Sequence, residues 1–155
     1  RRFCEHELVN LLCSSFCGKA SRMGIDLIVD ARLPQTLSIS DTELCSILSN
    51  GLENAIVAAS KSTDTERNVA LYCNIRLNKL LIEIKNPYDG EITMRDDLPV
   101  SFQDGHGYGC RSIRTIVQRY HGLCSFEPDR GVFTLRIAIP LNREEYTALL
   151  QHSGR

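Results

Sequence analysis

The sequence predicts a two-layer α/β sandwich (an α+β arrangement), in which helices pack on one face of a mixed, mostly antiparallel sheet. Amphipathic segments with a helical repeat of apolar residues are separated by runs rich in β-branched residues, and two pairs of these runs are joined by short turn sequences typical of hairpins. The elements follow in the order helix, strand, helix, two strands, long loop, helix and two strands. Because no repeat or internal boundary is visible, we expect residues 1–155 to form a single domain.

The first half of the chain contains the first helix, the first strand and the longest helix. Apolar residues recur with helical spacing over residues 5–23, and residues 25–33 alternate as a strand. Ser40, with Glu43 three residues later, forms the sequence signature of a capping box. The helix that this box opens is expected to run to about Ser60, with its apolar stripe toward the core.

The second half contains four strands in two hairpins and two further helices. The predicted strands are residues 67–77 and 80–86, joined at Asn78-Lys79, and residues 123–128 and 131–140, joined around Asp129-Arg130-Gly131. The predicted helices are residues 109–121 and a terminal segment, residues 142–151, capped by Asn142.

Residues 87–106 have no hydrophobic period and are rich in Asp, Gly and Pro. A loop of about twenty residues is uncommon in a compact domain and is usually a lid or a binding loop. We therefore expect a long lid over about 87–106.

The composition is typical of a water-soluble domain and excludes several classes of partner. With 43% hydrophobic residues, 24% charged residues and a net charge of −1, the chain lacks the basic surface that nucleic acids and acidic membranes favour. No apolar run approaches the roughly 18 residues of a membrane span, so we expect no direct membrane insertion and no nucleic-acid partner. The seven cysteines form neither a CxxC pair nor a zinc spacing, which favours reduced, core-filling thiols in the cytoplasm.

A group of polar side chains lies on one face of the longest predicted helix. Asn50, Glu53 and Asn54 are spaced i, i+3 and i+4, so their side chains converge. A carboxamide oxygen is a hard, neutral ligand that suits a Mg²⁺ ion already carrying phosphate oxygens and water. A solvated polar face is the alternative interpretation, and this segment alone does not decide between them.

A glycine-alternating motif, Gly105-His106-Gly107-Tyr108-Gly109, runs directly into a predicted helix. Uncovered backbone N–H groups at a helix start, together with the positive end of the helix dipole, favour an anion such as a nucleotide phosphate. Taken alone, such a run could be only a flexible turn. It is not a Walker A loop, and because no strand immediately precedes it, it is not a dinucleotide fingerprint.

A third motif stands at the end of the strand predicted over residues 80–86. Asn86 is followed by Pro87-Tyr88-Asp89-Gly90, which places a polar side chain beside a tight turn. Such a group can hydrogen-bond the edge of a buried base.

The three motifs, in this order, resemble the N, G1 and G2 boxes of the Bergerat-fold (GHKL) ATPases. The chain is most similar to the ATP-binding catalytic domain of sensor histidine kinases, in the branch of quorum-sensing peptide-receptor kinases, and the similarity extends from Cys4 to Arg136. The resemblance implies ATP and Mg²⁺ as cofactors and transfer of the γ-phosphate to a histidine on a separate dimerisation domain of the same parent protein. It also implies a downstream response regulator, two-component signalling and a cytoplasmic location, as the cytosolic domain of a membrane receptor kinase.

The resemblance also implies roles for individual residues. Asn54 matches the Mg²⁺-ligating asparagine and Asn50 the polar position one turn earlier, and these two are the expected catalytic residues. Asn86 falls where most members have an adenine-binding aspartate, and Tyr88 stands in place of the first glycine of the G1 turn. The remaining expected nucleotide-binding residues match the second glycine of that turn and the phosphate-cradling loop: Gly90, Gly105, His106, Gly107, Tyr108 and Gly109.

Charge and position alone suggest two cations, Lys61 and Arg95, as further phosphate contacts. Gyrase-like and chaperone-like relatives carry a glutamate where this chain has Asn50, and a neutral amide cannot abstract a proton. Slow hydrolysis and transfer to a protein nucleophile are therefore expected. Glu53 lies about 100° around the helix from Asn54. It could orient Asn54 or a water molecule, but we expect it to be solvated.

No acceptor histidine is visible in the sequence. His6 lies too few residues before Asn54 for a helical hairpin to fit between them, and we expect it to be a partly exposed helix residue. Two alternatives remain open: a nucleotide-binding or partner-binding domain of the same fold without turnover, and an anti-sigma-type serine kinase.

Overall fold

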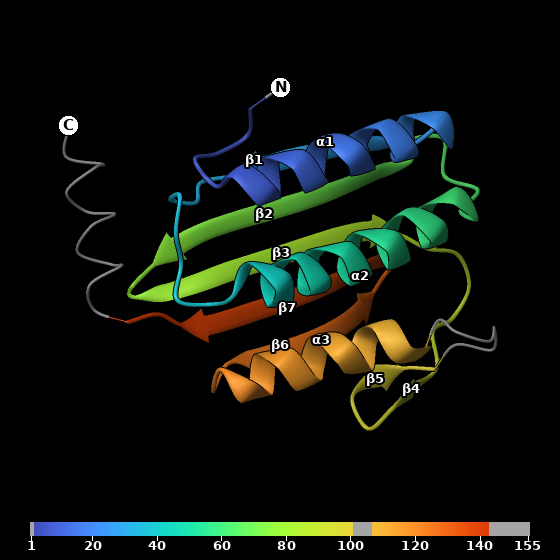
Figure 1. Ribbon diagram of the computed structural model, residues 1–155. Helices are drawn as coiled ribbons and strands as arrows, with labels where there is room; N and C mark the ends of the chain where they lie inside the picture. Colours follow the sequence, from blue (N-terminus) through green and yellow to red (C-terminus); the bar gives the residue numbers. More distant parts are fainter. Residues whose placement is uncertain (1, 101–106, 143–155) are drawn as a thin grey trace.

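The computed structural model describes residues 2–100 and 107–142, in which three helices cover one face of a five-stranded sheet (Figure 1). The helices are α1 (Glu7–Arg22), α2 (Asp41–Ser60) and α3 (Gly107–Arg119). The strands of the sheet are β1 (Asp26–Ala31), β2 (Asn68–Arg76), β3 (Lys79–Pro87), β6 (Leu123–Asp129) and β7 (Val132–Pro140), and a separate pair consists of β4 (Met94–Arg95) and β5 (Leu98–Pro99).

The sheet is mixed and mostly antiparallel, as predicted. Its order is β1-β2-β3-β7-β6, in which β1 pairs with β2 in parallel and the other neighbours pair antiparallel. The parallel pair follows from the connection through α2, since parallel neighbours need a long crossover whereas antiparallel neighbours need only a tight turn. The β2–β3 turn is centred on Leu77 and Asn78, both with positive φ, one residue earlier than predicted.

The core lies between the sheet and the helices, with α2 at its centre (Figure 1). The predicted apolar stripe of α2 is buried, with Leu44, Ile47, Leu48, Leu52 and Ile56 fully inaccessible to solvent. Each such side chain contributes about 1.5–3 kcal/mol by leaving water. This burial fixes the axis of α2 and therefore the position of its polar residues.

The lid region differs from the prediction because it contains secondary structure. Met94 and Arg95 pair with Pro99 and Leu98 in a hairpin, whose turn holds Asp96 and Asp97 at φ of 54° and 61°. Strands of two residues carry no detectable alternation, so the sequence pattern did not reveal them. The helix predicted over 109–121 begins two residues earlier, at Gly107, and the predicted terminal helix over 142–151 lies almost entirely outside the described residues.

The prediction of a partly exposed His6 is wrong. His6 is the N-cap of α1 and is only 1% exposed. Its Nδ1 accepts a hydrogen bond from the Val9 N–H at 3.4 Å, and its Nε2 lies 3.1 Å from Oδ1 of Asp41. The imidazole supplies the acceptor that an N-cap requires, while its other nitrogen faces the first turn of α2.

The capping box of α2 is present, but the hydroxyl of Tyr120 lies between the Ser40 backbone N–H and the Glu43 carboxylate. The Glu43 N–H donates to Ser40 Oγ at 3.1 Å, as predicted. The Ser40 N–H, however, donates to the hydroxyl of Tyr120 at 3.1 Å, and that hydroxyl donates to Glu43 Oε1 at 2.6 Å. Tyr120, next to the end of α3, thus connects α3 to the start of α2, which is far from it in the sequence.

All seven cysteines lie in the described part of the chain as thiols, with Cys13, Cys73 and Cys110 buried and the other four half-buried. No helix among the described residues is long and apolar enough to cross a bilayer.

Candidate functional site

A cavity of about 480 Å³ opens between the C-terminal half of α2, the inward faces of β3 and β7, the first turns of α3 and the segment after β3. This volume lies within the range of roughly 300–1,000 Å³ found for small-molecule sites. Three of the predicted site residues line it: Asn54, Lys61 and Asn86. The other lining residues are Gly51, Ala55, Val57, Ala58, Ile84, Glu91, Ile92, Pro99, Val100, Cys110, Ile113, Phe126, Phe133 and Leu135.

Asn50 and Asn54 stand one turn apart on α2, and hydrogen bonds orient both amides. The Asn54 Nδ2 donates to Cys110 Sγ at 3.5 Å. The Asn50 Nδ2 donates to the Ser46 carbonyl oxygen at 2.9 Å and lies 3.3 Å from Ser46 Oγ. Since the nitrogen atoms are engaged in these bonds, each side chain offers its carbonyl oxygen to a further partner, and an oxygen is the atom that Mg²⁺ prefers.

The start of α3 lies directly against these two amides. A Cβ placed on Gly109 would be 3.2 Å from Asn54 Nδ2 and 3.3 Å from Asn50 Oδ1. Only a glycine lets the helix start approach so closely without displacing a neighbour. The structure therefore brings together the asparagine-bearing helix and the last glycine of the motif, as the sequence led us to expect.

The backbone at the start of α3 suits an anion. The first N–H groups of a helix lack partners within it, and the dipole adds partial positive charge there. Gly107, Tyr108 and Gly109 form the backbone of this first turn, and Gly109 lies beside Asn54. Gly105 and His106 lie outside the described residues.

Asn86 is a polar side chain in an otherwise apolar part of the cavity. It is 4% exposed, and its Nδ2 donates to the Pro87 carbonyl oxygen at 2.9 Å. Phe133 is its register partner on β7, and Ile84 and Leu135 form the next inward pair. The arrangement leaves Oδ1 as the acceptor that Asn86 offers inside a largely apolar pocket.

Tyr88, Gly90 and Arg95 are not among the lining residues. The Tyr88 N–H donates to the Gly131 carbonyl oxygen at 3.0 Å, which continues the β3–β7 pairing, and Gly90 is an exposed turn residue with φ of 71°. Arg95 is exposed in the β4–β5 hairpin.

The role of Asp89 is not evident from the sequence pattern. Its carboxylate accepts hydrogen bonds from the Thr63 N–H at 2.7 Å and from Ser62 Oγ at 3.1 Å. The hydrogen bonds from Thr63, first of all that from its backbone N–H, lower the pKa of Asp89 below its usual 3.8. Asp89 thus fastens the turn after Asn86 to the residues that follow α2.

Glu53 was expected to be solvated, but its carboxylate has a partner. Its carboxylate forms an ion pair with the Lys19 ammonium of α1, and Glu53 does not line the cavity. The carboxylate adjacent to Asn54 therefore links α2 to α1.

Cys110 was predicted only as a core-filling thiol, whereas its sulfur lies at the site. Burial raises the pKa of Cys110 to about 11, so the sulfur remains a neutral thiol that accepts from Asn54. The aromatic and aliphatic lining was also missed. The alternation of β3 and β7 could have revealed it once their register was known. The described residues contain no group of three or more His, Cys, Asp or Glu side chains that could hold a metal ion.

A family model described as the GHKL domain matches residues 39–140. The sensor histidine kinase CitA of Klebsiella pneumoniae is 29% identical over 160 residues, which cover 94% of this chain but only 28% of CitA. This chain thus spans little more than a quarter of the length of that relative.

Solved structures of histidine kinases share the fold. The catalytic domain of ThkA matches with a TM-score of 0.70 and 19% identity, covering 90% of this chain and 93% of that one. The Acinetobacter baumannii histidine kinase AdeS gives a TM-score of 0.65 at 15% identity, covering 88% and 64%. Full-length ShkA in complex with AMPPNP gives 0.65 at 17% identity, covering 87% and 29%.

The family model covers well over half of the chain and includes α2, the cavity-lining strands and α3. At these identities the solved structures establish the fold alone, and that fold is the Bergerat arrangement that the three sequence motifs suggested. The chain belongs to the GHKL domain family.

Proposed function

We propose that this chain is the ATP·Mg²⁺-binding catalytic domain of a sensor histidine kinase, which positions the γ-phosphate of ATP for transfer to a histidine of another domain. The observation that carries the proposal is the close approach of Gly109 to Asn50 and Asn54, together with the cavity that Asn54 and Asn86 both line. In this proposal Asn54 is the metal-binding group, Asn86 is the base-binding group, and the start of α3 beside Asn54 is the phosphate-binding group.

The base end of the proposed site is the apolar pocket around Asn86. Phe133, Ile84 and Leu135 provide flat and aliphatic surface, which suits an uncharged heterocycle. Oδ1 of Asn86 would accept a hydrogen bond from the exocyclic amino group of adenine. Because the Asn86 side chain is buried, a base without a donor at this position would leave the acceptor unpaired.

The phosphate end lies at the start of α3. Asn54 would hold Mg²⁺ through Oδ1, Lys61 would contribute positive charge, and the first N–H groups of α3 would bind phosphate oxygens. Magnesium ATP, when bound, supplies an activated phosphoryl group whose charge the metal partly neutralises. Glycine at position 109 keeps side-chain atoms out of this end, where a Cβ would press on the amides of Asn50 and Asn54.

The residues around Asn54 favour transfer to a protein side chain over hydrolysis. Asn50 is neutral and cannot abstract a proton from water, and Glu53 is paired with Lys19. The chain's contribution to the reaction would therefore be positioning and electrostatic stabilisation.

The acceptor histidine would come from a separate dimerisation domain of the same parent protein. His6 is buried as a helix cap, so it cannot serve as an acceptor without disrupting α1. As the resemblance in the sequence implies, the parent would be a membrane receptor kinase whose cytosolic part contains this domain, and it would signal to a response regulator.

A second candidate function is nucleotide binding without turnover. Asn86 and Tyr88 stand where most relatives were expected to carry an aspartate and a glycine, and this departure is the observation in its favour.

The decisive experiment replaces Asn54 with alanine and measures ATP binding by calorimetry with and without Mg²⁺. We expect the Mg²⁺-dependent part of the affinity to fall about tenfold or more, since hydrogen bonds and ligands to charged groups contribute roughly 1.5–3 kcal/mol. The matched control is Asn74→Ala on the opposite face of the sheet, which should bind as the parent does.

Adding a separately produced helical domain that carries the acceptor histidine then separates the two candidates. Phosphorylation of that histidine supports the kinase, and ATP binding without transfer supports the second candidate. Equal Mg²⁺-dependent affinity in Asn54→Ala and the parent would refute the metal assignment.

A further inference from the structure

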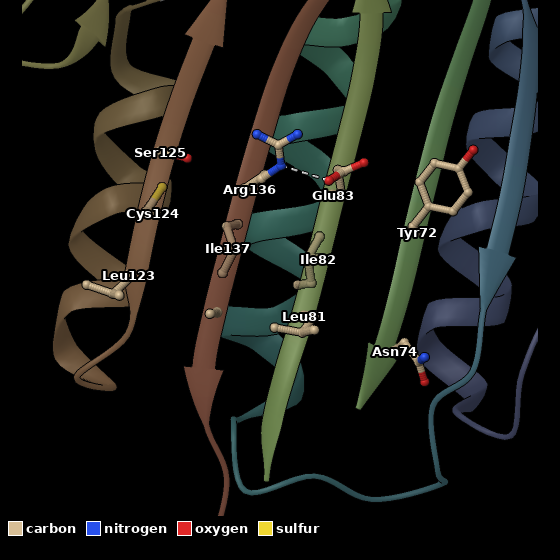
Figure 2. A pocket seen from close by; sticks show the side chains of 11 residues that line it. Tyr72, Asn74, Leu81, Ile82, Glu83, Leu123, Cys124, Ser125, Arg136 and Ile137 are labelled. Carbon is tan, nitrogen blue, oxygen red and sulfur yellow. Dashed lines mark hydrogen bonds and ion pairs between the residues drawn. The ribbon is translucent and has the colours of Figure 1, made fainter. Parts of the chain in front are cut away.

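The face of the five-stranded sheet that carries no helix has an apolar hollow of about 550 Å³ (Figure 2). Leu123, Ala138 and Leu81 lie in one row across β6, β7 and β3, because Leu123 pairs with Ala138 and Ala138 pairs with Leu81. Asn74 of β2 continues the row. Leu123 is 75% exposed, so the described residues leave a large aliphatic side chain uncovered on this face.

Charged side chains border this apolar row on both sides. On one side Arg136 bonds to Glu83 at 2.9 Å, as Figure 2 shows, and also pairs with Glu127. On the other side the exposed residues Arg76 and Lys79 lie opposite each other at the ends of β2 and β3. The second border is therefore positively charged.

The described part of the chain ends on this positively charged side of the row. Pro140 pairs with Lys79, and the Leu141 N–H donates to the Asn78 carbonyl oxygen at 2.9 Å. In the same turn Leu77 is 81% exposed. The side-chain oxygen of Asn78 is buried and accepts no hydrogen bond from the residues that the structure describes. An unpaired buried acceptor costs about 1–3 kcal/mol, so a donor from a further segment is expected here.

The sequence that follows has the chemistry to cover this face. Within residues 143–155, Tyr146, Leu149 and Leu150 recur at i, i+3 and i+4, which places them on one side of the helix that the sequence predicts. Glu144 and Glu145 stand near the start of the segment, where Arg76 and Lys79 would face them.

We propose that residues 143–155 dock across the helix-free face of the sheet, with Tyr146, Leu149 and Leu150 on the row of Leu123, Ala138 and Leu81. The segment closes the exposed side of the domain from within the same chain. This inference does not depend on nucleotide binding, because the face lies on the opposite side of the sheet from the nucleotide cavity.

The test uses the absence of tryptophan from the sequence. A single tryptophan introduced as Leu123→Trp in the full chain reports whether this position is covered. We expect its emission to lie at a shorter wavelength than that of a solvent-exposed tryptophan and to be quenched less by acrylamide. Both effects should be lost when Leu149→Glu and Leu150→Glu are added, because two carboxylates cannot be buried on the apolar row.

Two controls match this design. Thr147→Glu with Gln151→Glu adds the same charge to the other side of the predicted helix and should preserve the shift. Leu11→Trp, at an exposed position on α1, should give the same emission in every variant, and equal urea denaturation midpoints of the variants verify that the domain remains folded.

A charge test examines the border of the row. Glu144→Lys with Glu145→Lys should weaken the shift, and adding Arg76→Glu with Lys79→Glu should restore it. The proposal is overturned if Leu123→Trp emits alike with and without the Leu149 and Leu150 changes. It is equally overturned if the shift disappears on dilution together with a dimer seen by sedimentation, since a second copy then covers the face.

Discussion

At the scale of single residues, Asn86 shows why an amide can replace the aspartate expected at this position. Its Nδ2 donates to the Pro87 carbonyl oxygen at 2.9 Å, and this bond determines which atom the side chain offers to the cavity. A carboxylate has no hydrogen to donate, so the same position would place two oxygen atoms against each other. Asn86 therefore fits the proline that follows it.

We accordingly expect Asn86→Asp to destabilise the domain by about 1–3 kcal/mol and not to raise its affinity for ATP. Urea denaturation and ATP titration of the variant provide the measurement. Asn74→Asp, the same change on the helix-free face, should stay within about 0.5 kcal/mol of the parent. Tighter ATP binding by Asn86→Asp at unchanged stability would contradict this explanation.

A substitution at Gly109 is expected to change helix stability and ligand binding in opposite directions. Alanine is favoured over glycine inside a helix by up to about 1 kcal/mol, but its Cβ would push on Asn50 and Asn54. We expect Gly109→Ala to unfold at the same or a higher urea concentration than the parent and yet to bind Mg²⁺·ATP several-fold more weakly.

Gly18→Ala is the matched control, because Gly18 lies inside α1 and a Cβ there would only reach the end of the Arg22 side chain at 3.4 Å. It should raise stability and leave affinity unchanged. If Gly109→Ala binds nucleotide as tightly as Gly18→Ala does, the start of α3 is not part of the site.

At the scale of elements, the hydroxyl of Tyr120 joins the end of α3 to the start of α2. It donates to Glu43, and this bond is the main reason why the pKa of Glu43 lies below its usual 4.5. A carboxyl with a lowered pKa in the folded state contributes stability above its unfolded pKa, and that contribution is lost as the pH falls through the folded value.

Tyr120→Phe should therefore be less stable than the parent at pH 7, and the difference should shrink as the pH falls below about 4.5. Urea denaturation at several pH values between 7 and 3 measures this. Tyr72→Phe, on the helix-free face, should show no pH-dependent difference. A constant difference between Tyr120→Phe and the parent over this range would rule out the coupling to Glu43.

At the scale of the whole molecule, local patterns predicted the layers, the strand pairing in hairpins and the contact between the asparagine-bearing helix and the glycine motif. They could not predict contacts between distant segments. Phe133 faces Asn86 only because β7 pairs with β3, and Tyr120 reaches Ser40 only after α3 packs beside α2. The buried cap His6 was missed because histidine is an uncommon N-cap, and the β4–β5 hairpin was missed because its strands are two residues long.

The cavity collects side chains from α2, β3, β7 and α3, so a ligand that binds there contacts elements from most of the chain. Such a ligand must stabilise the domain as a unit, by about 2.7 kcal/mol when its concentration is a hundred times its Kd. For a domain of about 150 residues, that corresponds to a rise in Tm of roughly 5–11 °C.

We expect Mg²⁺·ATP to raise the Tm by an amount in this range, and ATP with a chelator to raise it less. In Asn54→Ala, Mg²⁺·ATP and ATP with a chelator should raise the Tm equally. The residue proposed to hold the metal is gone in this variant, while the pocket around Asn86 remains. Asn74→Ala should respond to both as the parent does. Differential scanning calorimetry at fixed nucleotide concentration measures the Tm of all three proteins under both conditions. An unchanged Tm in the parent at saturating Mg²⁺·ATP would mean that the cavity between α2 and α3 does not bind the nucleotide, whatever its shape.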